Sequence, residues 1–242
     1  MLKKNLSRPA LSLGALLSSA SWLSAILPQP LSIQTDLTYS SEYVFRGVRV
    51  AQDSFQPNIE ASTGGFYTGI WANLPTDAVD SEINYYGGYG FAIPAIEEVA
   101  WDLGLTVYHY PDTGSDRTHE IYFGGSLQLP GYPAWGASLY YFHDFDIESH
   151  VGEGKLTYTC SLEGLGLPAA LDFELYGGVQ GGGTSSVDSY HYYGGSVALP
   201  YALTDQSTVT VALRYGTAEK FSFGPGQRGK NLFWSIGYTT SL

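Results

Sequence analysis

SEYVFRG (residues 41–47), followed by FQPNIEAS (residues 55–62) and GFYTGIWAN (residues 65–73), sets a pattern that the rest of the chain repeats. In the second segment apolar and polar residues alternate at every position. Side chains on a β-strand point to opposite faces with a period of two, so this segment predicts a strand with one apolar and one polar face. The turn before the third segment holds Gly64 and Gly65, which is typical of a tight hairpin.

Strand-like segments of about ten residues recur to the C-terminus, and this is the length that a tilted strand needs to cross a bilayer. They centre on residues 36–45, 55–62, 66–73, 82–93, 100–110, 118–129, 135–144, 154–162, 170–180, 189–199, 208–216 and 231–240. No long segment shows helical periodicity, and no domain linker is evident. The prediction is an all-β fold: a single closed antiparallel transmembrane β-barrel of about 12 strands over residues 33–242.

Two features favour a membrane barrel over a soluble antiparallel sheet, in which the same alternation would occur. Carboxylates recur on one face of the predicted strands, as at Glu60, Asp102 and Asp172, and apolar residues occupy the other face. The connections also alternate: one set is short, as at 130–133, and the other is more polar and often longer, as at 217–230. Short periplasmic turns opposite longer outer loops are typical of outer-membrane barrels.

The opening segments also carry a resemblance to a known family. SEYVFRG, the PNIEAS strand and GFYTGIWAN are similar to the opening of the TorF family of porins, which are Gram-negative outer-membrane β-barrels. This specific similarity covers the first quarter of the mature chain, and beyond it the match is one of aromatic, glycine-rich strands. The resemblance implies an outer-membrane barrel more firmly than it implies a substrate.

Composition and the N-terminus agree with export. Residues 1–32 predict a cleavable signal peptide, because Lys3, Lys4 and Arg8 precede an apolar stretch of small residues. Aromatic residues make up 15% of the chain and charged residues only 14%, which suits many strands with interfacial aromatic belts. The net charge of −12 argues against nucleic acid as a partner. A single cysteine, Cys160, excludes an internal disulfide framework.

Catalytic chemistry has little support in the sequence. A serine hydrolase needs a nucleophile on a defined turn beside a base, and no G-x-S-x-G motif is present. Four of the five histidines fall on the outward face near strand ends, where amphipathic rings anchor at the headgroup level: His109, His119, His143 and His191. The fifth, His150, is expected in a loop. We therefore predict no enzyme, no catalytic residue, no metal and no cofactor, and the alternatives are an outer-membrane barrel enzyme acting on lipid or a non-conducting structural or adhesive barrel.

Ionisable residues on the inward face are the candidates for a pore lining. They are Glu42, Arg46, Glu60, Glu82, Asp102, Glu120, Lys155, Asp172, Glu174 and Arg214. An isolated buried charge is costly, so either water fills the lumen or the bases pair with some of the acids. Acids outnumber bases, so a wet lumen is the simpler interpretation, and a charge introduced by Thr106→Arg should then be tolerated. The last long loop, with Phe221, Phe223 and Pro225, is expected to plug the pore in part.

These patterns predict a porin-like outer-membrane channel for passive diffusion of small hydrophilic solutes, with a preference for cations. The expected partners are outer-membrane lipid and lipopolysaccharide, with the barrel assembly machinery and periplasmic chaperones during biogenesis. Acidic residues of the predicted outer loops, such as Asp112 and Asp146, are interpreted as solvated charge rather than as calcium sites, because their spacing fits no EF-hand.

Loop character predicts the orientation of the barrel. An even strand number places both termini in the periplasm, so the loops at 145–150 and 217–230 should face outside and the turn at 130–133 should face the periplasm. A cysteine placed in each, on a Cys160→Ser background, should react with a membrane-impermeant maleimide on intact cells in the two loops but not in the turn. Labelling of the turn alone would reverse the orientation.

Overall fold

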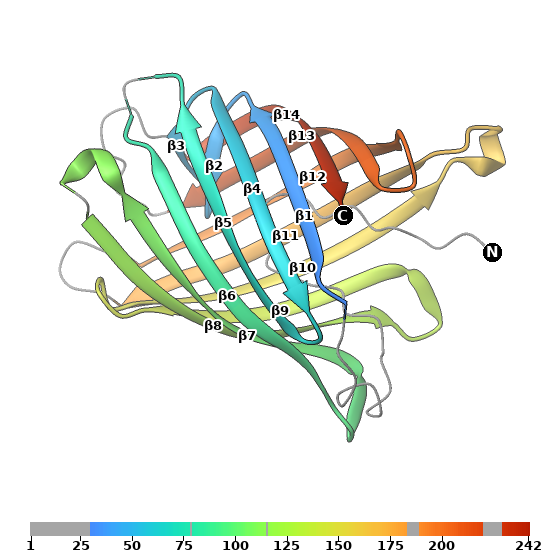
Figure 1. Ribbon diagram of the computed structural model, residues 1–242, viewed down its shortest axis with the longest axis horizontal. Coiled ribbons are helices and arrows are strands. Elements are labelled where there is room, and N and C mark those ends of the chain that lie inside the picture. Colours follow the sequence, from blue (N-terminus) through green and yellow to red (C-terminus); the bar gives the residue numbers. More distant parts are fainter. Residues whose placement is uncertain (1–29, 78, 115, 183–188, 220–228) are drawn as a thin grey trace.

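The computed structural model describes residues 30–242, apart from residues 78, 115, 183–188 and 220–228. Twelve strands form one closed antiparallel barrel, and two further strands form a small hairpin (Figure 1). The predicted all-β barrel and its strand number are therefore confirmed. Most of the predicted signal peptide lies outside the described residues, as do the loop residues Phe221, Phe223 and Pro225 that were expected to plug the pore.

Wall strands that are neighbours in the sequence pair with one another, and β1 closes the wall by pairing with both β14 and β4. The wall strands are β1 (Ser32–Ser40), β4 (Ser54–Thr63), β5 (Phe66–Pro75), β6 (Glu82–Ile93), β7 (Ile96–Tyr110), β8 (Asp116–Leu129), β9 (Tyr132–Asp144), β10 (Ser149–Ser161), β11 (Ala170–Gly182), β12 (Tyr190–Ala202), β13 (Ser207–Glu219) and β14 (Lys230–Ser241). Two short 3-10 turns, η2 (Pro111–Thr113) and η3 (Glu163–Leu165), lie in connections. Within the described part of the chain, neither helical turn has the length or apolar content for a membrane crossing.

The two ends of the barrel differ in their connections. The end that holds Leu242, here called the terminal end, has two-residue turns at 64–65 and 130–131, although the connection at 162–169 is longer. The opposite end, here called the loop end, has longer connections, of which 41–53 contains the hairpin. This alternation follows the loop character that the sequence predicts.

For the first predicted strand, residues 36–45, the predicted boundary at the loop end is wrong. β1 stops at Ser40, and β2 (Tyr43–Phe45) and β3 (Val48–Ala51) pair with each other in a separate hairpin. Ser40 pairs directly with Ser54 of β4, so the residues between these two serines have no place in the wall. They fold into the barrel instead, where the first residue of β2 and both ends of β3 are buried.

The turn of the β2–β3 hairpin consists of Arg46 and Gly47, which have positive φ values of 46° and 78°. Positive φ at both central residues suits the tight turns that match the twist of paired strands. Glycine at position 47 is required for a second reason, because a Cβ there would collide with the carbonyl of Thr217 and the side chain of Tyr192. The hairpin tip therefore lies against β12 and β13.

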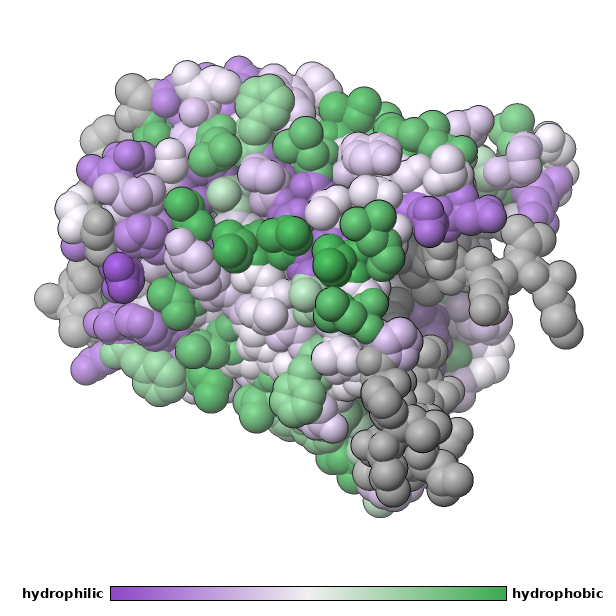
Figure 2. Space-filling model, in the orientation of Figure 1, coloured by the Kyte–Doolittle hydropathy of each residue, from purple (hydrophilic) through white to green (hydrophobic). Residues whose placement is uncertain are grey.

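The outward face of the wall is apolar. Large apolar side chains at alternate positions are exposed, among them Leu103, Leu105, Leu213 and Ile236. Figure 2 shows hydrophobic side chains over the middle of the visible wall and hydrophilic ones toward the loop end at the left. Such a surface is a liability in water and is the expected surface in lipid.

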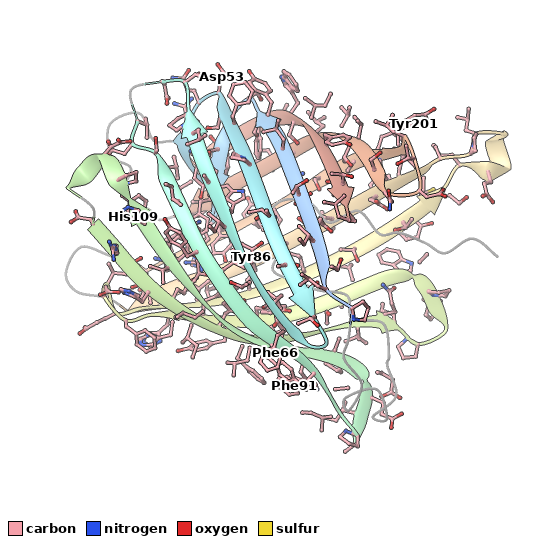
Figure 3. The ribbon with its side chains drawn as sticks, in the orientation of Figure 1. Asp53, Phe66, Tyr86, Phe91, His109 and Tyr201 are labelled. Atoms are coloured by element: carbon pink, nitrogen blue, oxygen red, sulfur yellow. The ribbon has the colours of Figure 1, made fainter. Side chains whose placement is uncertain are left out.

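Outward aromatic rings contact one another from strand to strand toward the terminal end. The ring centroids of Phe66 and Tyr89 are 4.5 Å apart, and those of Trp101 and Phe123 are 5.4 Å apart. Phe66 and Phe91 both lie on the lower side of the wall in Figure 3. Because aromatic rings gather at membrane–water interfaces, this row marks the interface at the terminal end.

Inward-facing tyrosines pack closely on glycines of neighbouring strands. A side chain on any of these glycines would collide with the tyrosine ring, so the close approach needs glycine. The pairs are Tyr67 over Gly88, Tyr122 over Gly104, Tyr140 over Gly124 and Tyr192 over Gly178. Each ring covers the backbone of the adjacent strand and carries its hydroxyl on toward the strand beyond.

The two faces of β7 give a direct test of the membrane-facing surface. Leu105 faces outward with 43% of its side chain exposed, so Leu105→Arg should lower the free energy of unfolding in lipid vesicles by about 2–4 kcal/mol. Leu105→Met is the control and should change it little. An unaffected Leu105→Arg barrel would contradict a lipid-facing surface at this strand.

Thr106, the next residue, corrects one expectation from the sequence. Its side chain faces inward but is only 4% exposed, so the wet surroundings on which tolerance of Thr106→Arg depends are not seen at this position. Thr106 lies between Tyr86 and Glu120 of the two neighbouring strands, and both of these larger side chains also face inward.

Candidate functional site

The hairpin tip is held to the wall by a buried ion pair. Nη2 of Arg46 donates to both carboxylate oxygens of Glu120 on β8, at 3.0 and 2.8 Å. Their side chains are 10% and 2% exposed. The hydroxyl of Tyr108 donates to the same carboxylate at 2.9 Å. A charge-assisted bond of this kind is stronger than a neutral one and leaves neither buried charge alone.

Aromatic rings complete the surroundings of Arg46. The guanidinium carbon lies 4.7 Å from the ring centroid of Phe45 and 5.1 Å from that of Phe142. Arg46 lies in the hairpin turn, outside the wall strands. Burial has the largest single effect on the pKa of its guanidinium and lowers it, but the Glu120 carboxylate together with Tyr108 and Tyr192 raises that pKa by more. The net shift is upward and the group stays charged.

The other side of the hairpin tip packs against β9 to β14. The Asn231 side-chain amide donates to the carbonyl oxygen of Gly47 at 3.2 Å. Val48 is buried in one apolar cluster with Phe142, Val151 and neighbouring tyrosines. The tip therefore contacts wall strands on both sides of the interior.

The hairpin base is fixed at the rim of the loop end. The Tyr39 hydroxyl donates to Asp53 at 2.7 Å, and the backbone N–H of Gln52 donates to Asp77 at 3.0 Å (Figure 3 labels Asp53). Ser41 exchanges hydrogen bonds with the backbone of Trp234 on β14. Both ends and the tip of the hairpin are thus tied to the barrel.

The structure places all ten predicted pore-lining residues on the inner side of the wall or on the hairpin. Besides Arg46 with Glu120, it brings Lys155 to 3.5 Å from Glu174. Glu42 lies on the hairpin 3.6 Å from Arg49. The other predicted residues are held mainly by neutral donors.

Tyrosine hydroxyls are the commonest of these neutral donors. Tyr67 donates to Asp102 at 2.8 Å, Tyr86 on β6 (Figure 3) donates to Glu60 at 3.2 Å, and Tyr43 lies 3.3 Å from Glu82. On the opposite wall Thr159 donates to Asp172 at 2.8 Å, and the Arg214 Nε–H donates to Ser235 at 3.2 Å. Such bonds give the inward carboxylates partners within the protein without a cation beside them.

Sequence reasoning missed the tyrosines and one acid. Glu153 on β10 accepts a hydrogen bond from Tyr192 at 2.8 Å, and its carboxylate lies 3.9 Å from Lys155. The signal was present in the tyrosine–glycine runs YYGGYG (residues 85–90) and YYGG (residues 192–195). Alternate residues of these runs face inward, so they supply both the rings and the glycines.

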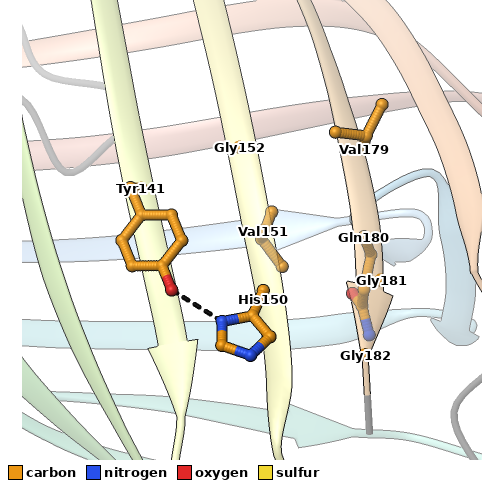
Figure 4. A pocket seen from close by; sticks show the side chains of 8 residues that line it. All are labelled: Tyr141, His150, Val151, Gly152, Val179, Gln180, Gly181 and Gly182. Atoms are coloured by element: carbon orange, nitrogen blue, oxygen red, sulfur yellow. Dashed lines mark hydrogen bonds between the residues drawn. The ribbon is translucent and has the colours of Figure 1, made fainter.

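A shallow groove of about 400 Å³ lies outside this interior, across the outer face of β9, β10 and β11. The Tyr141 hydroxyl lies 2.6 Å from Nδ1 of His150 at its edge (Figure 4). His150 belongs to β10, so its expected place in a loop is wrong, because that strand begins at Ser149. The ring of His143 stacks on that of His150 at 4.4 Å.

The remaining polar groups near the loop end organise the loops. Nδ1 of His119 lies 2.8 Å from Asp146, and this hydrogen bond lowers the pKa of the Asp146 carboxyl. Asp112 accepts from the backbone N–H of Ser81 at 2.8 Å. Among the residues that the structure describes, no cluster of three or more histidine, cysteine or acidic side chains is placed to bind a metal.

An apolar outward wall, a polar and charged interior and complete closure define an outer-membrane type of β-barrel. Residues 26–155 match the model of the Gcw_chp family, which is described as a bacterial protein of unknown function. The match spans more than half of the chain, and the chain therefore belongs to the Gcw_chp family.

Solved structures of channels share the fold. The KdgM porin matches with a TM-score of 0.57 and 13% identity over 87% of this chain and 99% of that one, and its complex with disordered oligogalacturonate gives the same values. The COG4313 outer membrane channel from Pseudomonas putida F1 matches with a TM-score of 0.53 and 11% identity, over 93% and 100% of the two chains. At this identity the similarity is one of fold. No curated protein matches in sequence.

The Arg46–Glu120 pair should determine whether the hairpin stays docked. Glu120→Gln leaves a buried guanidinium without its counter-charge, which costs about 3–5 kcal/mol. The docked fraction should fall accordingly, and trypsin should cleave after Arg46 and Arg49 at least roughly 100-fold faster than in the wild type. Mass spectrometry of the fragments measures this.

The control is Glu60→Gln, which removes an inward carboxylate that bonds to Tyr86 rather than to the hairpin. Its hairpin should remain protected, and gel mobility before and after heating should show that both variants form the barrel. Equal protection of Glu120→Gln and the wild type would show that the ion pair does not hold the hairpin.

Proposed function

We propose that this chain is a porin-like channel of the bacterial outer membrane, of the kind that the resemblance to the TorF family implies. It provides passive diffusion for small hydrophilic solutes and prefers cations. In this proposal residues 1–32 are the signal peptide that directs export, and outer-membrane lipid and lipopolysaccharide surround the wall. The barrel assembly machinery and periplasmic chaperones act during biogenesis.

One observation carries the proposal: the same strands present an apolar face outward and a polar, charged face inward. On β7, Leu103 and Leu105 are exposed on the outside, whereas Asp102 bonds to Tyr67 on the inside. Only a barrel with lipid outside and polar contents inside gives both faces a suitable environment. The shared fold with structures described as porins and channels supports the same function.

The hydrogen bonds of three histidines near the loop end argue against the lipid-enzyme alternative. His150 bonds to Tyr141, His119 to Asp146, and His143 to the carbonyl oxygen of Ser149. A hydrolase would need a histidine that faces a nucleophilic hydroxyl. These rings instead bond to phenol, carboxylate and backbone groups at the headgroup level, where they anchor the barrel.

The interior charge favours cations over anions. The ten pore-lining candidates comprise seven acids and three bases, and two of the bases, Arg46 and Lys155, lie against carboxylates. A low-dielectric wall that carries one sign of charge concentrates the opposite ion. The KdgM structure was determined with oligogalacturonate, a polyanion, and the acidic lining argues that this chain takes a different class of solute.

Purified protein in a planar bilayer tests the channel and its selectivity. Under a salt gradient the reversal potential should have the sign of a cation-selective pore, and Glu60→Gln with Asp102→Asn should move it toward zero. At about 0.15 M salt the Debye length is about 8 Å, so a narrow pore keeps its selectivity. Absence of conductance would overturn the channel, and an anion-selective wild type would overturn the preference for cations.

A further inference from the structure

The β2–β3 hairpin divides the loop-end half of the interior into two unlike seams. The apolar seam lies toward β9 to β12, where Val48 of the hairpin packs on Phe142, Val151 and Tyr192. The polar seam lies toward β4 to β7. Tyr43 and Ala51 of the hairpin pack on Trp71 there, and the other buried side chains are mostly polar. They are Gln56, Asn73, Glu82, Asn84 and Thr106, each 7% exposed or less.

Three buried polar atoms in the polar seam have no hydrogen-bond partner among the residues that the structure describes. They are the indole Nε1 of Trp71, Oδ1 of Asn84 and Oγ1 of Thr106. Trp71 on β5 is paired with Asn84 on β6, and Thr106 on β7 is paired with Tyr86, the next inward residue after Asn84. One donor, one acceptor and one hydroxyl thus lie on three consecutive strands.

Buried polar atoms of this kind need partners. Leaving one unsatisfied costs about 1–3 kcal/mol, and native proteins satisfy nearly all of them with protein, water or ligand. A seam that gathers three such atoms is suited to small polar guests. In the apolar seam, Val48, Phe142 and Val151 offer no polar side-chain atom, and the hydroxyl of Tyr192 in the same cluster already bonds to Glu153. An apolar constriction of this kind hinders ions by dewetting.

Carboxylates lie at both ends of the polar seam. Glu82 lies toward the loop end and accepts from the Asn84 amide at 2.8 Å and from the Tyr43 hydroxyl of the hairpin at 3.3 Å. Toward the terminal end, Glu60 and Asp102 follow, each bonded to a tyrosine hydroxyl. The charge of Arg46, on the far side of the hairpin, is offset by Glu120.

We propose that the permeation path past the hairpin runs through the polar seam, and that the seam takes small hydrated cations or small solutes that carry an ammonium group. Glu82 is its specificity-determining residue. This inference rests on the proposed channel function and goes beyond it, because it names the route, the class of solute and the residue that selects it.

Cysteine modification compares the two seams directly. Thr106→Cys places a thiol in the polar seam, and Val151→Cys places one in the apolar seam, both on a Cys160→Ser background. The two native residues are almost equally buried, at 4% and 1% exposed. Their exposure in the structure therefore predicts no difference between the modification rates of the two cysteines. The probes are a trimethylammonium methanethiosulfonate and a sulfonate methanethiosulfonate of similar size, applied to single channels in a planar bilayer.

The current through Thr106→Cys channels should fall on modification, at least tenfold faster with the cationic reagent than with the anionic one. Val151→Cys channels should keep their current. Asn84→Cys gives a second position in the polar seam if Thr106→Cys assembles poorly. Modification of Val151→Cys while both polar-seam cysteines stay inert would overturn the route.

Glu82→Gln tests the selecting residue. On the Thr106→Cys background it should reduce the preference for the cationic reagent severalfold, whereas Glu163→Gln, at an exposed position in the connection at 162–169, should leave the preference unchanged. An unchanged preference in Glu82→Gln would overturn its role. A wild type without conductance would overturn the channel and the route together, whereas a conducting wild type with inert polar-seam cysteines would overturn the route alone.

Discussion

Closure of the backbone hydrogen bonds around the wall is the constraint on which the rest of the structure depends. In lipid every backbone polar group must be paired within the barrel, and β1 meets this requirement by pairing with β14 and with β4. Because Ser40 pairs with Ser54, the residues between them are excluded from the wall. They include Tyr43, Phe45 and Val48, whose apolar side chains favour burial in the interior over exposure at the rim.

The barrel has an interior that is neither filled like the smallest barrels nor open like the large porins, and twelve strands give a width between these limits. Tyrosines packed on glycines line this interior, and their hydroxyls provide hydrogen bonds to inward acids such as Asp102 and Glu60. The acids therefore have hydrogen-bond partners that carry no charge. From the sequence, a packed interior and an acidic lining were treated as alternatives. With tyrosine hydroxyls as partners for the acids, the loop-end half of the barrel has both.

The strands and their faces could be predicted because a period of two is a local property of the sequence, and β6 has the predicted bounds, Glu82–Ile93. The end of β1 could not, because the residues after Ser40 continue as a plausible strand up to Gly47, and the pairing with β4 that excludes them is not local. Likewise, Arg46 and Glu120 are 74 positions apart, so their common parity could be predicted but not their contact. The place of the hairpin inside the barrel depends on these long-range pairings.

The ion pair that holds the hairpin also determines the electrostatics of the interior. An unpaired guanidinium at the hairpin tip would place a positive charge across the route of any cation, and it would oppose the field of the acids on both sides. Bonded to both oxygens of Glu120, Arg46 contributes little net charge, and the field along β4 to β7 stays that of Glu82, Glu60 and Asp102. One contact therefore holds the hairpin against the wall and leaves the carboxylates along β4 to β7 as the main charges on that side. The fold can narrow its lumen in this way without reversing the sign of the charge that a solute meets.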